Sequence, residues 1–203
     1  MNNIEENYQK SKSISEFATG YFEYLKQVLD LLDPNSIEQL SAEFEKAREN
    51  GNTIFVAGNG GSAATATTMA NDIGFDIIKK TGTDKPFKVF ALTDNTSVIT
   101  AIANDVGYEN IFINQLRIHY RQGDKLLVIS ASGNSENIVK AAKWVKSQGG
   151  KVIGFLGFDG GKVIDICDIV VHVKTKSGEY GPVEDTHLIL NHILAHWFQN
   201  KLK

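Results

Sequence analysis

The sequence has little cysteine and no excess of one charge. A single cysteine, Cys167, occurs among 203 residues, so no disulfide can form within the chain and a reducing compartment is expected. The 21 lysines and arginines are balanced by 24 aspartates and glutamates, and no dense basic cluster suggests a nucleic-acid partner. No apolar run approaches the roughly 18 residues of a membrane span. These absences favour a soluble cytoplasmic protein that binds neither nucleic acid nor membrane.

The remaining composition is that of one α/β domain. With 203 residues, of which 42% are hydrophobic, the chain is long enough for one well-filled core and short for two. Strands are expected near 53–57, 87–92, 125–130, 151–156 and 169–173, and helices near 61–79, 95–104, 109–121, 134–148, 160–166 and 183–201. This alternation predicts a five-stranded parallel sheet with helices on both faces.

Residues 1–50 are expected to add a helical hairpin before the α/β core of residues 51–203. Apolar residues recur every three or four positions from Ser13 to Leu32, which predicts a long amphipathic helix. Ser36, with Gln39 three residues later, predicts the capped start of a second helix that ends near Asn50. The hairpin either packs partly against another subunit or covers its own sheet, and the sequence leaves both arrangements open.

The first expected strand runs into a glycine-rich turn, Gly58-Asn59-Gly60-Gly61-Ser62. Glycine permits positive φ and lets a ligand approach the main chain closely. The first amides of the following helix lack partners inside the helix and lie at the positive end of its dipole. This segment, the glycine turn, therefore predicts an anion site.

The third expected strand ends in a second turn, Ser130-Ala131-Ser132-Gly133-Asn134-Ser135, the serine turn. Its hydroxyls add donors to the free amides. Two such turns at the carboxyl ends of parallel strands predict a crevice for a phosphorylated ligand. A plainer interpretation of each serine, including Ser62, is a helix cap or a turn former.

The glycine turn also satisfies the dinucleotide fingerprint G-x-G-x-x-G/A. That fingerprint needs an acidic residue about 20 residues further on, at the end of the second strand. Here the second strand ends at Leu92-Thr93-Asp94, more than 30 residues on, and two helices precede the motif. A nicotinamide or flavin enzyme is thus the weaker interpretation, and no nucleotide cofactor is expected.

Four motifs in register resemble the sugar isomerase (SIS) domain family, and most closely its phosphoheptose isomerases. They are the glycine turn, Ala103-Asn104-Asp105, the serine turn and Gly157-Phe158-Asp159-Gly160-Gly161. The resemblance covers essentially the whole chain, residues 1–203, as a single SIS domain. It implies a homotetramer that binds a small sugar phosphate.

The resemblance also implies how that sugar phosphate is held. The serine turn would hold the phosphate, with Ser130, Ala131, Ser132, Asn134 and Ser135 as its contacts. Asn59, Gly60, Gly61, Ser62, Asn104 and Asp105 would line the sugar. This division is chemically sensible, because hydroxyls and amides suit phosphate oxygens whereas Asn and Asp side chains suit sugar hydroxyls.

Phosphoheptose isomerases carry a His and a Glu one turn apart on the helix after the first turn, and a Gln and a His eight residues apart on the last helix. These four groups also bind zinc in that family. In this chain the positions hold Thr68, Asp72, Glu184 and His192, so only the last is unchanged. An acid/base pair, Asp72 and His192, is retained. Asp72, Glu184 and His192 could still hold a metal ion such as zinc, although Thr68 replaces the expected His.

Aldose–ketose isomerisation needs a base and an acid that act through an enediol. Asp72 is the expected base and His192 the expected acid, or the reverse, while Glu184 orients the sugar or holds a metal. His192 also lies beside an apolar stripe of the last helix, where a histidine is often structural. The resemblance therefore implies an isomerase that converts sedoheptulose 7-phosphate to a D-glycero-D-manno-heptose 7-phosphate. Two alternatives stay open: an isomerase of another sugar phosphate, or a non-catalytic SIS module of the kind that binds sugar phosphates or a replication initiator.

Overall fold

The computed structural model describes all 203 residues, Met1 to Lys203. Five parallel strands form one sheet in the order β2-β1-β3-β4-β5. The strands are β1 (Thr53–Gly58), β2 (Lys88–Ala91), β3 (Lys125–Ser130), β4 (Lys151–Gly157) and β5 (Ile169–Val173). The predicted five-stranded parallel sheet is therefore confirmed.

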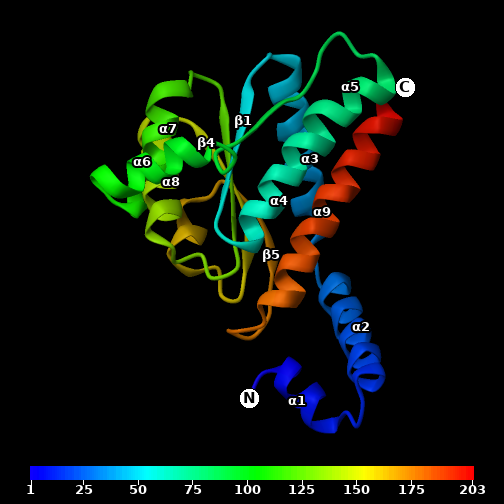
Figure 1. Ribbon diagram of the computed structural model, residues 1–203. Coiled ribbons are helices and arrows are strands. Elements are labelled where there is room, and N and C mark those ends of the chain that lie inside the picture. The colour runs from blue at the N-terminus through cyan, green and yellow to red at the C-terminus, as the bar shows by residue number, and fades with distance from the viewer.

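Helices cover both faces of this sheet (Figure 1). One face packs against α3 (Pro34–Glu49), α4 (Gly61–Met69), α5 (Asp76–Thr81) and α9 (Tyr180–Lys201) around a core of 21 buried residues. The other face packs against α7 (Ile111–His119), α8 (Glu136–Ser147) and the 3₁₀ segment η3 (Gly161–Ile166), with 17 buried residues. The partly buried α6 (Thr96–Val106) and the 3₁₀ segment η2 (Tyr108–Asn110) complete this layer. None of the helices has the length and hydropathy that crossing a membrane requires.

The amino-terminal region differs from the expectation in two places. The sequence did not predict α1 (Asn3–Lys10), which buries no residue and begins with a capping box between Asn2 and Glu5. Ser36 is not the cap of α3, because the Asp33 side chain accepts from the Asn35 amide and Pro34 is the first helical residue. Proline suits that position because its missing N–H would be unpaired there anyway.

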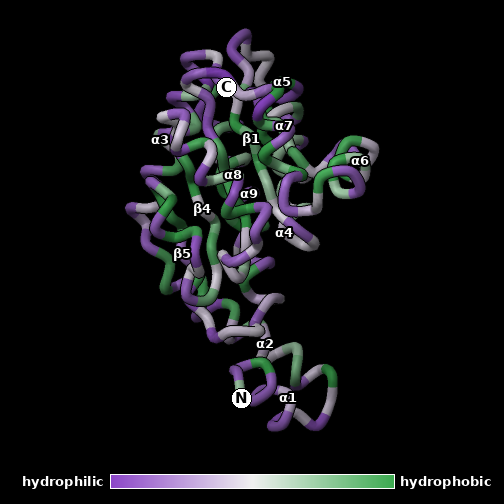
Figure 2. Tube along the Cα trace, turned by 90° about the vertical axis from the view of Figure 1, so that its left-hand side faces the viewer, coloured by the Kyte–Doolittle hydropathy of each residue, from purple (hydrophilic) through white to green (hydrophobic).

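The two long amino-terminal helices pack differently. α3 buries Leu40, Phe44 and Ala47 against its own sheet. By contrast, α2 (Ile14–Asp30) buries only Val28 and leaves Phe22 67% exposed. α1 and α2 extend from the body of the domain in both views (Figures 1 and 2). Of these two helices, therefore, only α3 covers the sheet.

The helix expected over 61–79 is continuous but irregular. A π-helical segment, η1 (Ala70–Phe75), separates α4 from α5 and contains Asp72. Such segments are rare and frequently occur at functional sites, because they redirect side chains that an α-helix would place elsewhere. This segment lies against α9, and we call their contact the Asp72 seam.

Candidate active site

The glycine turn and the serine turn meet at the point where the strand order reverses. From β1 the chain continues to β2 on one side, whereas β3 pairs with the other side of β1 and leads on to β4. Gly58 of β1 pairs with Ile129 of β3, so both strands end at the same level. In open parallel sheets this reversal creates a crevice beyond the carboxyl ends of the strands, where ligands bind.

Local packing requires glycine in the glycine turn. Gly60 has φ +56°, and a Cβ on Gly58 would overlap the main-chain carbonyl of Ser62. No side chain caps α4, so its first amides stay free for a ligand. Ser62 is buried but makes no capping bond, and its interpretation as a helix cap is wrong.

The serine turn divides its hydroxyls between structure and solvent. The Ser130 hydroxyl accepts from the Gly133 amide at 3.0 Å, and the Ser132 hydroxyl accepts from the Asn134 amide at 3.3 Å. These two serines therefore act partly as turn formers. Ser135 is the residue before α8, yet its side chain makes no capping bond. Its hydroxyl is therefore available to a ligand.

A pair of asparagines joins the two turns. The Asn59 and Asn137 side chains exchange two hydrogen bonds, of 3.0 and 2.9 Å, and the Tyr108 hydroxyl also donates to Asn59 at 2.9 Å. Asn137 is buried, and neither it nor Tyr108 was assigned a role from the sequence. Their side chains hold Asn59 in place at the crevice.

A cavity of about 160 Å³ lies between the two turns. Its lining comes from both turns and from α9: Asn59, Ser62, Ile129, Ser130, Ala131, Ser132, Ser135, Tyr180 and Glu184. A neighbouring cavity of about 370 Å³ shares Ser132 and Tyr180 with it and also includes Asn134. Tyr180 is a lining residue that the sequence did not reveal. The first cavity is small and polar, as a phosphate group with its adjoining carbons requires.

Glu184 lies at the edge of this cavity, over Gly61. Burial raises the pKa of its carboxyl group, and the charge of Asp185 raises it further. Asp185 itself accepts a 2.5 Å hydrogen bond from the Tyr21 hydroxyl. Burial and this contact with Asp185 raise the pKa of Tyr21. Helix α2 is thereby attached to the first turn of α9, beside the candidate site.

Asp72 and His192 meet at the Asp72 seam. The Nε2 atom of His192 lies 3.7 Å from Oδ2 of Asp72, and both side chains are partly exposed. The same Oδ2 accepts a 2.8 Å hydrogen bond from the side-chain amide of Asn191. The structure thus brings the expected acid and base together and adds a third residue that the sequence did not single out.

The remaining predicted residues lie apart from this pair. The Thr68 hydroxyl donates to the Ala64 carbonyl oxygen of its own helix at 2.9 Å. Asn104 and Asp105 are on the last turn of α6, hydrogen-bonded to each other at 2.8 Å, and they do not line the cavity.

The side chains present do not fit a zinc ion. A protein zinc site gathers three or four nitrogen, sulfur or oxygen ligands around one point. Asp72 meets only His192, whereas Glu184 lies at Gly61, and no three His, Cys, Asp or Glu side chains come together anywhere in the chain.

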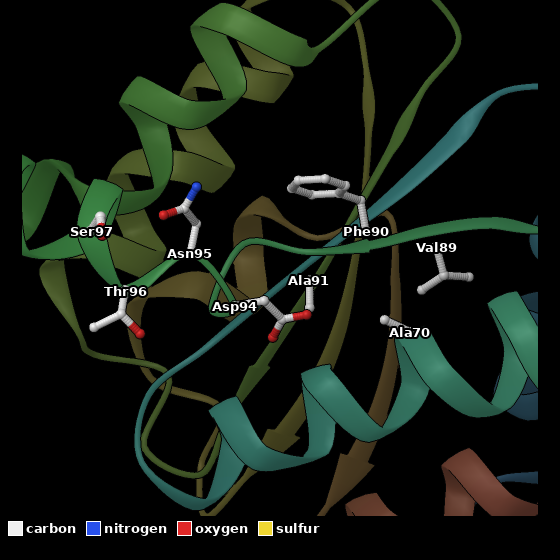
Figure 3. A pocket seen from close by; sticks show the side chains of 8 residues that line it. All are labelled: Ala70, Val89, Phe90, Ala91, Asp94, Asn95, Thr96 and Ser97. Carbon is white, nitrogen blue, oxygen red and sulfur yellow. The ribbon is translucent and has the colours of Figure 1, made fainter.

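A larger cavity of about 400 Å³ lies at the edge of the sheet, between Ala70 and the segment Val89–Ser97 (Figure 3). It contains Asp94, the acidic residue that follows the second strand. The Asp94 carboxylate accepts hydrogen bonds from the Thr67 and Thr93 hydroxyls. This cavity is outside the strand reversal, so the crevice between the two turns remains the stronger candidate.

The fold and the two turns define a SIS domain protein. A family model described as "SIS domain" matches residues 17–157. This match spans well over half of the sequence, and the chain belongs to the SIS domain family.

Phosphoheptose isomerases are similar to this chain in sequence and in structure. The phosphoheptose isomerase of Aneurinibacillus thermoaerophilus is 39% identical over 160 residues, covering 78% of each chain. That of Aliarcobacter butzleri is 34% identical over 197 residues, covering 95% of this chain and 98% of the relative. The structure of phosphoheptose isomerase GmhA from Neisseria gonorrhoeae has a TM-score of 0.80 at 29% identity and covers 93% of this chain. These relatives confirm the family and the isomerase class expected from the sequence.

Proposed function

We propose that this protein is a phosphosugar isomerase that converts sedoheptulose 7-phosphate to D-glycero-D-manno-heptose 7-phosphate. One observation carries the proposal: a small polar cavity lies between the glycine turn and the serine turn, and the helix α9 that lines it also carries His192. The relatives named above support the substrate. Phosphorylated sugars are confined to the cytoplasm by their charge, so we infer that the protein acts there.

In the proposed reaction the substrate phosphate lies on the serine turn. The Ser132 and Ser135 hydroxyls and the free amides donate to its oxygens, while Glu184 contacts a sugar hydroxyl. Asp72 removes a proton from carbon 1, and the electron pair of that C–H bond forms the double bond of an enediol. His192 gives a proton to the carbonyl oxygen on carbon 2. Return of a proton to carbon 2 and loss of the proton from the oxygen on carbon 1 give the aldose.

The two roles can also be exchanged, so that His192 is the base and Asp72 is the acid. No step requires a metal ion, in keeping with the poor fit of the side chains to zinc. The chemistry a bound zinc would supply is polarisation of the carbonyl group.

We further propose that the protein is a homo-oligomer, a tetramer by analogy with the family. Exposed apolar residues support this proposal: Phe22 on α2, Phe75 in η1, and Ile193 and Trp197 on α9. Surfaces of this kind are typical of interfaces between subunits. Light scattering after size-exclusion chromatography should give a mass several times that of one chain, and a monomer would contradict the proposal.

A second candidate function is a non-catalytic module that binds a sugar phosphate. The observation that favours it is Thr68, whose hydroxyl is committed to its own helix at a position where an isomerase of this family carries an imidazole.

One assay distinguishes the two functions. Purified protein is incubated with sedoheptulose 7-phosphate, and the aldose phosphate is followed by NMR, with chelator and with added zinc. We expect turnover that survives chelation. Binding of the sugar phosphate without turnover in any condition would favour the non-catalytic module or another substrate. Turnover that chelation abolishes and zinc restores would show that a metal site forms despite Thr68.

A further inference from the structure

Two amide groups hold the Asp72 carboxylate. Asn71 donates to Oδ1 at 3.0 Å, and Asn191 donates to Oδ2 at 2.8 Å. His192, at 3.7 Å, is beyond the distance of a direct hydrogen bond. Because Asn71 is exposed whereas Asn191 is fully buried, the orientation of Asp72 depends mainly on Asn191.

Asn191 is an unusual residue for its place in the fold. It lies with no exposed surface on α9, one residue after Leu190 and three before Leu194, both of which belong to the hydrophobic core. Its Oδ1 atom is buried and has no hydrogen-bond partner. A buried polar atom without a partner lowers the stability of the folded protein. An apolar side chain here would avoid that cost, so stability alone does not account for an asparagine.

His187, one turn earlier on the same face of α9, has the same property. It is fully buried against the Phe155 ring, and neither ring nitrogen makes a hydrogen bond of ordinary geometry, although the Leu156 backbone lies close enough to act on its pKa. Residues four apart on a helix are neighbours on its surface. His187 therefore lies beside Asn191 on the buried face of α9.

The donor that faces Asp72 is of the wrong kind for a metal centre. A metal ion needs the lone pairs of the carboxylate, whereas the Asn191 amide directs its hydrogens, the positive end of its dipole, at the same oxygen. With the Thr68 hydroxyl turned to Ala64, the seam offers hydrogen-bond donors around an anion instead of ligands around a cation.

We propose that Asn191 is a positioning residue that holds Asp72 for proton transfer, in the role that a metal ion would otherwise fill. This role rests on the proposed isomerase function. Asn191 does not touch the substrate. It keeps Oδ2 of Asp72 at one place between the helix and the sugar, and the loss of its amide frees the carboxylate to rotate.

The test compares Asn191→Leu, which has a similar volume and no donor, with Asn191→Asp, which keeps the size and shape but loses the amide. Gln199→Leu is the control, because Gln199 is another buried polar residue of α9, and its side chain accepts a hydrogen bond from Lys80. We expect both Asn191 variants to lower kcat for sedoheptulose 7-phosphate at least tenfold with KM within twofold. Gln199→Leu should keep the wild-type kcat. A kcat loss confined to Asn191 is not what a merely structural role produces.

Two further measurements separate the possible failures. If Asp72→Asn is inactive and both Asn191 variants keep the wild-type kcat, the positioning role is wrong and the proposed function stands. If the wild type does not turn over the sugar phosphate, the proposed function fails, and the positioning role fails with it. Calorimetric titration with zinc should show no tight binding to the wild type. Tight binding that disappears in Asp72→Asn would overturn the claim that Asn191 takes the role of a metal.

Discussion

The two halves of the candidate site are built in different ways. The phosphate half consists of the glycine turn and the serine turn, which use main-chain amides, short hydroxyl side chains and hydrogen bonds between near neighbours. The Asp72 seam joins side chains that are about 120 positions apart in the sequence. The first half is therefore a property of short segments, whereas the second exists only when η1 and α9 have docked.

This difference explains where the chain departs from its relatives. A turn that holds an anion through its backbone tolerates few substitutions, because a side chain in place of each glycine would be sterically unfavourable. A seam of side chains can change one residue at a time. Here Asp72 and Thr68 stand where the resemblance implies a longer carboxylate and an imidazole, and Asn191 donates a hydrogen bond to Asp72. Each substitution predicted below changes one half of the site and leaves the other half as it is.

The largest expected effect is on the rate, in Asp72→Asn. Loss of the carboxylate removes the proposed base and should lower kcat by about 10²- to 10⁴-fold, while binding of the sugar phosphate to the serine turn persists. Steady-state kinetics and calorimetry measure the two quantities. Asp94→Asn, a carboxylate at the edge cavity, is the control and should keep the wild-type kcat. An active Asp72→Asn would remove Asp72 from the mechanism.

The second effect is on the stability of the phosphate half, in Gly133→Ala. Gly133 has φ +62°, and a Cβ there would overlap the carbonyl oxygen of Gly160. The left-handed conformation costs about 1–2 kcal/mol, and the clash with main chain should bring the loss to about 3 kcal/mol or more.

Gly149→Ala provides the matched control for that substitution. Gly149 has φ +71°, and a Cβ at this position would have no atom within 4 Å, so only the conformational cost applies. Urea unfolding should show a loss for Gly133→Ala at least twice that for Gly149→Ala. Equal losses would show that the serine turn can move away from Gly160.

A smaller effect is expected from Ser135→Ala, which should change binding without changing stability. The hydroxyl makes no capping bond, so unfolding should stay within about 0.5 kcal/mol of the wild type. Loss of one hydrogen bond to a charged phosphate should raise KM about tenfold. Ser13→Ala is the opposite case, because the Ser13 hydroxyl caps α2. It should cost about 1 kcal/mol of stability and leave KM unchanged.

Much of the fold and of the phosphate half could be predicted from the sequence. Alternating apolar segments located all five strands, and glycine and serine at strand ends indicated both turns. These signals are local, and the fold preserves them. The helix α1 was missed because it buries nothing, although the Asn2 and Glu5 pair that caps it was visible.

The Asp72 seam could be predicted only in part. Family positions pointed to Asp72 and His192, but nothing in the periodicity of α9 distinguishes Asn191 from a core residue. The role of Asn191 depends on the side chain that faces it in the folded protein. The π-helical segment that presents Asp72 has no recognisable sequence pattern here. Likewise, Asn104 and Asp105 were assigned to the sugar by motif, and the structure places them on α6 outside the cavity.

The smallest expected effect is a pH dependence of stability that originates from His187 on α9, which packs against Phe155 of β4. Burial lowers the pKa of His187 to about 3, against about 6.5 in the unfolded chain. Below pH 6.5 the unfolded chain therefore binds a proton that the folded protein does not. Stability falls as the pH falls from 6.5 toward 3, by at most about 1.4 kcal/mol per pH unit.

Urea unfolding at pH 7.5, 6.5 and 5.5 measures this slope. His187→Leu should flatten this slope by up to one proton, because the carboxylates contribute equally to the wild type and the variant. Ser135→Ala should keep the wild-type slope, since no group with such a shift lies in the serine turn. A His187→Leu variant with the full slope would mean that the ring is protonated in the folded protein. Water would then reach the face of α9 that also carries Asn191, and the orientation of Asp72 could not rest on a buried asparagine.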